Sequence, residues 1–143
     1  MDIIRKETDY AVRCLIRLAG LVPGSIESVK QIATEAALPE PLLRKILQRL
    51  VKGGIVVSVK GRNGGVHLAR GPHQITLHDI IEAVQGQVVV SRCTLPGACC
   101  DNMPGCRLHE CIGQIQTKIE SVLKETTVAD LLGEVGRDRN GTR

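Results

Sequence analysis

Cysteine residues dominate the chemistry that this sequence could carry. Five of its six cysteines fall in one stretch, CTLPGACCDNMPGCRLHEC, together with a histidine. The start of the chain, MDIIRKETDY, lacks the apolar run of a secretion signal, so crowded thiolates favour a soft metal centre over a disulfide framework. No Cys-x-x-Cys pair is present, which argues against a zinc ribbon. The sixth cysteine, Cys14, lies on a helical apolar stripe and is expected to be buried. The candidate ligands are Cys93, Cys99, Cys100, Cys106, His109 and Cys111.

A second chemically marked region is basic. No acidic residue occurs between Pro41 and His78, whereas seven Lys and Arg do. In a chain with a net charge of +4, such a block favours a polyanion partner over a solvated surface. Arg and Gln can make paired hydrogen bonds to guanine and adenine edges, while Lys and other Arg hold phosphates. The predicted DNA contacts are Arg44, Lys45, Gln48, Arg49, Lys52, Lys60, Arg62 and Asn63.

The elements that carry these basic residues are expected to form a helix-turn-helix. Apolar residues at helical spacing predict a helix from about residue 7 to residue 21. Ser28 begins a short second helix over 29–36, in the form of a capping box. A third helix begins at Pro41, and Gly53 ends it.

A hairpin and two further helices are expected to follow. The β-favouring runs IVVSV and VHLA flank KGRNGG, in which Asn63-Gly64 is a strong hairpin signal, so the hairpin reads as a wing. Another helix is expected to begin at Thr76 and end at Gly86. After an irregular loop over 93–106, a long helix from about Leu108 to Lys124 carries a narrow aliphatic stripe suited to a partner helix. The fold class is therefore mainly α with a small β wing.

The expected organisation has four parts. Residues 1–86 form the winged helix-turn-helix, 87–107 the cysteine-rich loop, 108–132 the dimerisation helix and end segment, and 133–143 a disordered tail. Hydrophobic residues make up 43% of the chain, but Tyr10 is the only aromatic one. A core without Phe or Trp would gain stability from dimerisation or a bound cofactor.

Several classes of function are disfavoured. No apolar run approaches the ~20 residues of a membrane span, so we expect a cytoplasmic protein. No nucleophile–base pair or phosphate-binding glycine motif is present, so we do not expect an enzyme.

Three segments together resemble a known family. ETDYAVRCL, LLRKILQRLVKGGIVVSVKGRNGGVHLAR and ITLHDIIEAVQG are similar to the IscR/NsrR/RirA/CymR family of bacterial winged-helix transcription regulators, and the match runs over about residues 1–132. The resemblance implies a homodimer joined through the long C-terminal helix and a pseudo-palindromic double-stranded DNA operator. In many members three loop cysteines hold an iron–sulfur cluster that controls DNA affinity, whereas members of the CymR kind have no cluster.

The resemblance also implies which residues would hold a cluster. Family members with a cluster show three cysteines about five residues apart, and Cys93, Cys99 and Cys106 fit this pattern. Cys100 is a rival for the middle position. Thiolates are the favoured ligands of iron–sulfur clusters. Structural zinc and a disulfide switch are the alternatives.

The fourth ligand has several candidates. His109 stands in the Cys-x-x-His pattern of IscR-like proteins, and Asp9 matches the aspartate that NsrR-like proteins contribute from the partner subunit. Cys111 could also serve; we prefer His109. We therefore expect a transcription regulator, and a repressor, with a 2Fe–2S or 4Fe–4S cluster that senses redox state, nitric oxide or iron supply. The alternative is a cluster-free regulator controlled by thiol oxidation or by an enzyme partner.

Overall fold

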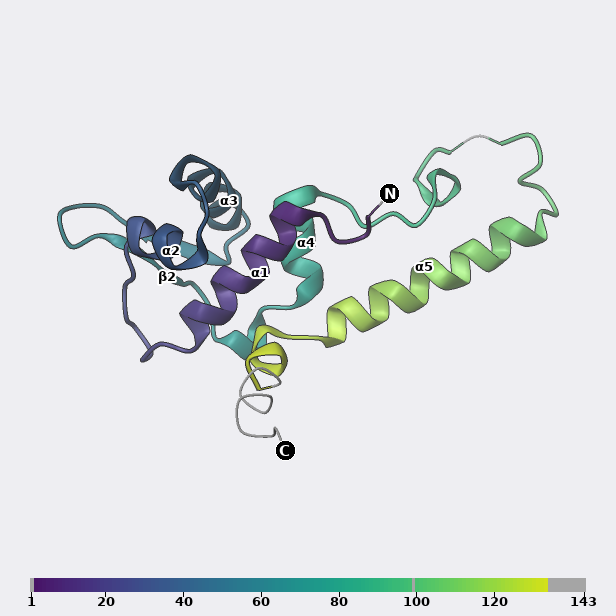
Figure 1. Ribbon diagram of the computed structural model, residues 1–143. Helices are drawn as coiled ribbons and strands as arrows, with labels where there is room; N and C mark the ends of the chain where they lie inside the picture. The colour runs from purple at the N-terminus through teal and green to yellow at the C-terminus, as the bar shows by residue number, and fades with distance from the viewer. Residues whose placement is uncertain (1, 99, 134–143) are drawn as a thin grey trace, which may run out of the picture.

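The computed structural model describes residues 2–98 and 100–133. Figure 1 shows a helical head from which one long helix projects. In chain order the elements are α1 (Lys6–Ala19), α2 (Val29–Ala36), α3 (Glu40–Lys52), β1 (Val56–Val59), β2 (Gly65–Leu68), η1 (Pro72–Gln74), α4 (Leu77–Gln85), η2 (Arg92–Thr94) and α5 (Arg107–Glu125). Residues 128–133 are also helical. The predicted fold class, mainly α with a small β wing, is confirmed.

The core of the head is aliphatic, as the composition predicts. Leu15 of α1, Ile32 of α2 and Ile80 of α4 have no exposed surface, and they pack around the buried side of α3. That side consists of Leu43, Ile46, Leu47 and Leu50. None of the helices in the described part of the chain is both long and apolar enough to cross a bilayer.

The helix-turn-helix is formed by α2 and α3 and is bounded by local signals. The Ser28 hydroxyl accepts a hydrogen bond from the Gln31 N–H at 3.1 Å, which caps α2. Ala37 ends α2 in the left-handed conformation. Pro39 is the N-cap of α3, so Pro41 occupies the second helical position rather than the predicted first. Proline is tolerated there because first-turn N–H groups have no partner within the helix.

The wing is an antiparallel pair in which Val56 lies opposite Leu68 and Val59 opposite Gly65. Residues 60–64 therefore form a five-residue loop, longer than a two-residue Asn-Gly turn. At its base, the Val66 N–H donates to the Glu27 carbonyl at 2.9 Å, and the Glu27 N–H donates back at 3.1 Å. A side chain at Gly65 would collide with the Glu27 carbonyl oxygen. Glycine at this position thus lets the wing lie against the segment before α2.

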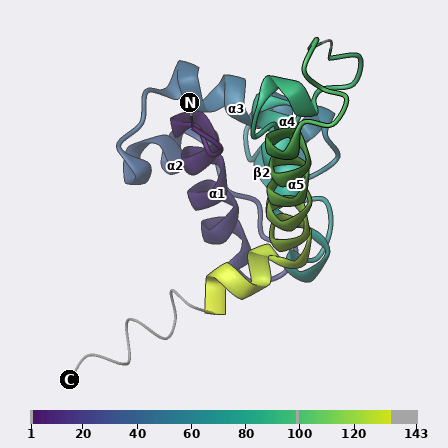
Figure 2. The same cartoon turned by 90° about the vertical axis from the view of Figure 1, so that its right-hand side faces the viewer.

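Helix α5 is anchored to the head through its C-terminal half. Val88 and Leu123 are buried together with Ile81 of α4, and Ile119 packs against them. Next to this cluster, the Leu77 N–H donates to the Thr126 carbonyl at 2.8 Å. The remainder of α5 and the cysteine loop extend away from the head (Figure 1), and in Figure 2 they point toward the viewer. The predicted tail lies outside the described residues, except that residue 133 is helical.

Candidate functional site

The outward face of α3 presents predicted DNA contacts to solvent. Successive helical residues are about 100° apart, so Lys45, Gln48 and Lys52 point away from the core side of α3, and all three are exposed. Arg44 lies toward the wing. Its guanidinium Nε donates to Glu40 one turn earlier at 3.1 Å, and the side chain remains half exposed.

A groove separates α3 from the wing. Arg44 and Gln48 line one part of it, a pocket of about 240 Å³. Arg44 also lines the adjoining part, of about 350 Å³, together with Lys60 and Lys30. Lys30 of α2 was not among the predicted contacts. Its position directly after a capped helix start could have indicated it, because such positions favour anions.

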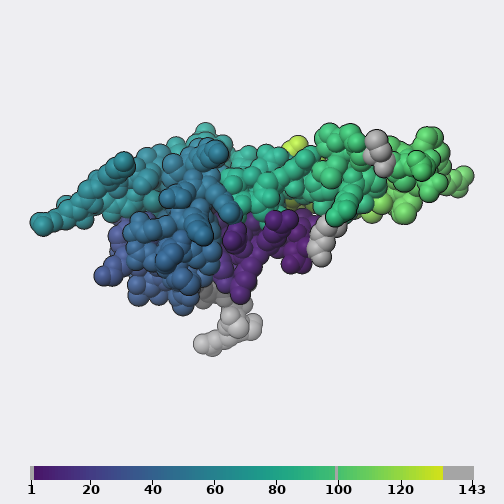
Figure 3. Space-filling model, turned by 90° about the horizontal axis from the view of Figure 1, so that it is seen from above, coloured from purple at the N-terminus to yellow at the C-terminus, as the bar shows by residue number. Residues whose placement is uncertain are grey.

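The loop of the wing carries the remaining predicted contacts. Lys60, Arg62 and Asn63 are exposed. The wing projects from one end of the molecule, and the cysteine loop lies at the other (Figures 1 and 3). The basic residues and the cysteines therefore form two separate regions of the chain.

Arg49 differs from the other predicted contacts on α3. Its Nη1 donates to the Glu7 carboxylate of α1 at 2.7 Å and to the Val84 carbonyl of α4 at 3.0 Å. This side of α3 faces its neighbouring helices and not the groove. The structure therefore places Arg49 at the junction of α1, α3 and α4.

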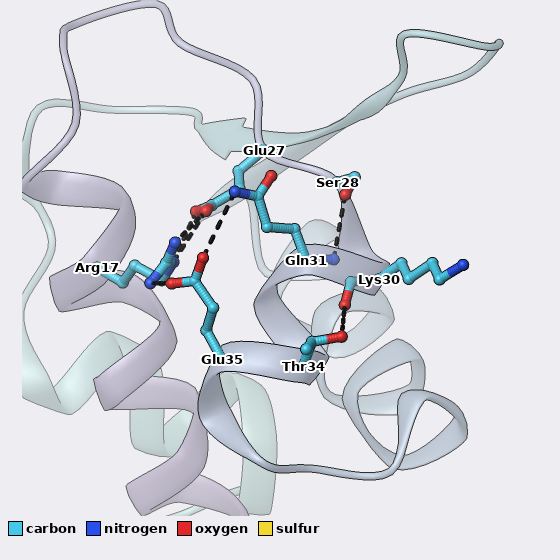
Figure 4. A network of polar contacts seen from close by, with 7 residues as sticks. All are labelled: Arg17, Glu27, Ser28, Lys30, Gln31, Thr34 and Glu35. Carbon is cyan, nitrogen blue, oxygen red and sulfur yellow. Dashed lines mark hydrogen bonds and ion pairs between the residues drawn. The ribbon is translucent and has the colours of Figure 1, made fainter.

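A polar network joins α1 to the helix-turn-helix and the wing (Figure 4). The Arg17 Nε donates to both carboxylate oxygens of Glu27, at 3.0 and 2.9 Å, and Arg17 also pairs with Glu35 of α2. Glu27 is buried, with 5% exposure. Because the Glu27 backbone pairs with Val66, this network fixes the base of the wing relative to α1.

Cys14 is buried close to this network, as predicted. Burial raises the pKa of its thiol to about 12, and the charge of Glu27 contributes to the shift. A neutral buried thiol is a poor nucleophile and metal ligand. Cys14 is therefore part of the core.

Two cysteines of the cysteine loop line one cavity. Cys93, within η2, and Cys100 both line a pocket of about 590 Å³, together with Arg92 and Pro96. Cys99 lies outside the described residues. Among the described residues, no three His, Cys, Asp or Glu side chains come together as a metal site.

Cys106 and His109 meet at the start of α5. Cys106 is the N-cap, and its Sγ accepts a hydrogen bond from the His109 N–H at 3.4 Å. The N-terminus of a helix favours negative charge, as on a thiolate. The Nδ1 atom of His109 is buried and has no hydrogen-bond partner among the described residues. A buried nitrogen in this state is suited to an additional ligand.

The other two candidates for the fourth ligand are placed differently. Asp9 accepts a hydrogen bond from Arg13, one turn later on α1, at 3.0 Å. Cys111 is exposed. It lies two residues after His109, about 200° further around α5, and therefore on the opposite side of the helix. Within one chain, Cys111 and His109 do not point toward the same site.

Gln116 of α5 holds the segment that leads into the cysteine loop. Its Nε2 donates to the Val88 carbonyl at 2.7 Å, and its Oε1 accepts from the Val90 N–H at 2.8 Å. The Thr94 hydroxyl lies 3.4 Å from the same Oε1. Because Thr94 belongs to η2, this amide side chain fixes the position of the segment next to Cys93.

A helix-turn-helix followed by a hairpin wing, with a basic groove between them, defines the class: a winged-helix DNA-binding protein. The profile of the Rrf2 family, described as iron-dependent transcriptional regulators, matches residues 4–134. The regulator NsrR of Oceanobacillus iheyensis is 32% identical over 130 residues, which are 90% of this chain and 88% of NsrR.

Solved structures agree with this assignment. CymR, the global cysteine regulator of B. subtilis, is 28% identical with a TM-score of 0.77, covering 94% of this chain and 98% of that one. IscR of T. potens is 30% identical with a TM-score of 0.72, covering 92% and 87%. The chain belongs to the Rrf2 family of transcriptional regulators. The family resemblance in the sequence is thereby confirmed.

Proposed function

We propose that this transcription regulator is a homodimeric repressor whose operator affinity is set by an iron–sulfur cluster sensing redox state, nitric oxide or iron supply. The observation that carries the proposal is the group of five cysteines between Cys93 and Cys111, which follows a winged helix and adjoins a projecting helix. The NsrR and IscR relatives and the iron-dependent family description support it.

Operator contacts are assigned to the groove and the wing. Gln48 and Arg44 would read base edges, because both can make paired hydrogen bonds in the major groove. Lys45, Lys52 and Lys30 would hold phosphates on either side. The wing would add phosphate or minor-groove contacts through Lys60, Arg62 and Asn63.

The donor set fits a cluster. Cys93, Cys99 and Cys106 would supply the thiolates, with Cys100 as the rival for the middle position. A bound cluster would supply a redox-active iron centre. The buried Nδ1 of His109, without a hydrogen-bond partner among the described residues, favours His109 as the fourth ligand over Asp9, whose carboxylate already pairs with Arg13.

The homodimer is assigned to the free side of α5. Leu108, Ile115 and Val122 recur at seven-residue intervals and are 67%, 42% and 61% exposed. This spacing places them on one stripe, as in paired helices. Cys111 lies between the first two on the same side, so we assign it to the interface and not to the cluster. Leu123, in the same helix, is buried against Ile81 of α4 and lies outside this stripe.

Anaerobic purification followed by an absorption spectrum and by iron, sulfide and zinc analysis tests the cofactor. Brown protein with stoichiometric sulfide, whose operator affinity changes when the iron is removed, is the expected result. Equal operator binding by loaded and apo protein would refute the sensing mechanism. Zinc without sulfide would refute the cluster. Colourless, metal-free protein would favour the cluster-free alternative, controlled by thiol oxidation or an enzyme partner.

A further inference from the structure

Arg49 joins the DNA-facing helix to two other helices through a single guanidinium nitrogen. Nη1 donates both to Glu7, in the first turn of α1, and to the Val84 carbonyl, in the last turn of α4. Nearly half of each of the two charged side chains is exposed, so their pairing is not required to neutralise a buried charge. Because one nitrogen serves both acceptors, it can keep both bonds only while α1 and α4 hold their relative positions.

The same end of α4 also holds the start of the chain. The Gln85 Oε1 accepts from the Arg5 N–H at 2.9 Å and from the Thr8 hydroxyl at 2.6 Å. Its Nε2 donates to the Ile3 carbonyl at 2.8 Å. Thr8 has no exposed surface. The first turn of α1 and the last turn of α4 therefore form one hydrogen-bonded unit.

This unit is continuous with the cysteine loop. Gly86, with φ +90°, turns the chain directly after Gln85. Val88 is buried against α5, and Gln116 holds the backbone of Val88 and Val90. Eight residues after Val84 the chain enters η2, which contains Cys93 and packs against α5. A displacement of η2 would thus be transmitted to the Val84 carbonyl, the acceptor of Arg49, through a short segment whose backbone is hydrogen-bonded to Gln116 at Val88 and Val90.

We infer that Arg49 is a positioning residue that couples the cysteine loop to the orientation of α3 on DNA. The inference deepens the proposed function and rests on it. When a change in the cysteine loop shifts the C-terminal end of α4, the Val84 carbonyl moves relative to the Arg49 guanidinium. Either the hydrogen bond between them then breaks and α3 is released, or the bond holds and α3 moves together with α4. Loss of the Arg49 side chain should uncouple the two regions, while the direct DNA contacts of α3 remain.

The test compares Arg49→Met with Lys45→Met, a matched change one turn earlier on the DNA-facing side of the same helix. Operator affinity is measured by titration for cluster-loaded and apo protein, and the ratio of the two affinities is taken. Lys45→Met should weaken both states by the same factor and leave the ratio at the wild-type value. Arg49→Met should bring the ratio at least about 3-fold closer to 1. A ratio within about 1.5-fold of wild type in Arg49→Met would overturn the inference.

A second readout uses apo protein and needs no cluster. Coupling between two sites is reciprocal, so saturating operator DNA should change amide hydrogen exchange over residues 87–94 in wild type and in Lys45→Met. The change should be absent in Arg49→Met, and an unaltered response there would overturn the inference. If Arg49→Met does not fold, Arg49→Lys decides, because it keeps a positive charge on α3 but has no guanidinium to bridge Glu7 and the Val84 carbonyl. The exchange response should again be lost, and a wild-type response in Arg49→Lys would overturn the inference. Equal operator affinities of cluster-loaded and apo wild type would refute the proposed cluster control. The hydrogen-exchange response of apo protein tests the role of Arg49 independently of that result.

Discussion

Replacing Arg17 by methionine is expected to destabilise the head by leaving Glu27 buried without its cation. Glu27 is 5% exposed, and Arg17 contacts both of its carboxylate oxygens. Removing one partner of a buried pair costs about 3–5 kcal/mol. Because the Arg17 side chain is 31% exposed, water can partly replace it, and we expect the lower end, about 3 kcal/mol. For a chain of 143 residues, this corresponds to a fall in Tm of roughly 6–12 °C.

Urea denaturation at a fixed protein concentration measures this loss, and the same helix provides a control. Arg13→Met removes an exposed ion pair to Asp9 one turn earlier and should cost below about 0.5 kcal/mol. The double variant Arg17→Met with Glu27→Gln should cost less than the sum of the two single changes, since the buried charge is then gone. A loss in Arg17→Met that matches the loss in Arg13→Met would refute the reasoning.

Three further predictions concern the DNA face, the core thiol and the dimer. Arg62→Ala and Arg44→Ala should each weaken operator binding, and the wing change should lower the slope of log affinity against log salt by about 1. Unchanged affinity in both, titrated at several salt concentrations, would contradict the DNA assignment. The folded protein favours the neutral form of the Cys14 thiol, so its contribution to the free energy of unfolding is complete below the ordinary pKa of 9. This contribution is lost as the pH rises from 9 toward the folded pKa of about 12. At pH 10 the free energy of unfolding of wild type should therefore have fallen by about 1.4 kcal/mol more than that of Cys14→Val. Urea denaturation at several pH values measures both, and parallel curves of unfolding free energy against pH would contradict this. Ile115→Glu should convert the dimer to a monomer in analytical ultracentrifugation, and an intact dimer would exclude the exposed stripe of α5 as the interface.

The sequence predicts the helices of the head closely because their ends carry local signals. Ser28 caps α2 at the expected residue. Thr76 and Asp79 form a reciprocal capping box at the start of α4. These signals act within one turn of the chain, so they can be recognised without knowledge of the tertiary structure.

The role of Arg49 could not be predicted in the same way. Helical periodicity separates the buried side of α3 from its exposed side, but it does not show which exposed residues meet a neighbouring helix. Lys45 and Arg49 therefore look alike in the sequence. Their difference depends on the positions of Glu7 and Val84, which lie 42 and 35 residues away from Arg49. The same holds for Gln85 and Gln116, whose amides bond to backbone groups far away in the sequence.

The ligand set of the cysteine loop is the least predictable part of the candidate site. The loop has no periodic pattern that would orient its side chains. The start of the loop is tied to α5 where the Thr94 hydroxyl lies beside the Gln116 amide. Its end is tied where Cys106 caps α5, with His109 in the first turn. Such loops commonly take their final arrangement from the metal that they bind. For this reason Cys99 and Cys100 cannot be distinguished by spacing alone.

Helix α5 can act as a lever, because its apolar packing on the head lies in its C-terminal half. Its 19 residues span about 28 Å, and the packing around Leu123 and Ile119 is its fulcrum. A tilt of roughly 10° about that point would displace the far end, where Cys106 and His109 lie about 20 Å away, by about 3–4 Å. Conversely, a movement of several ångströms at the cysteine loop would rotate α5 by only a small angle where it packs against α4. The geometry therefore converts a large local rearrangement into a fine adjustment of the head.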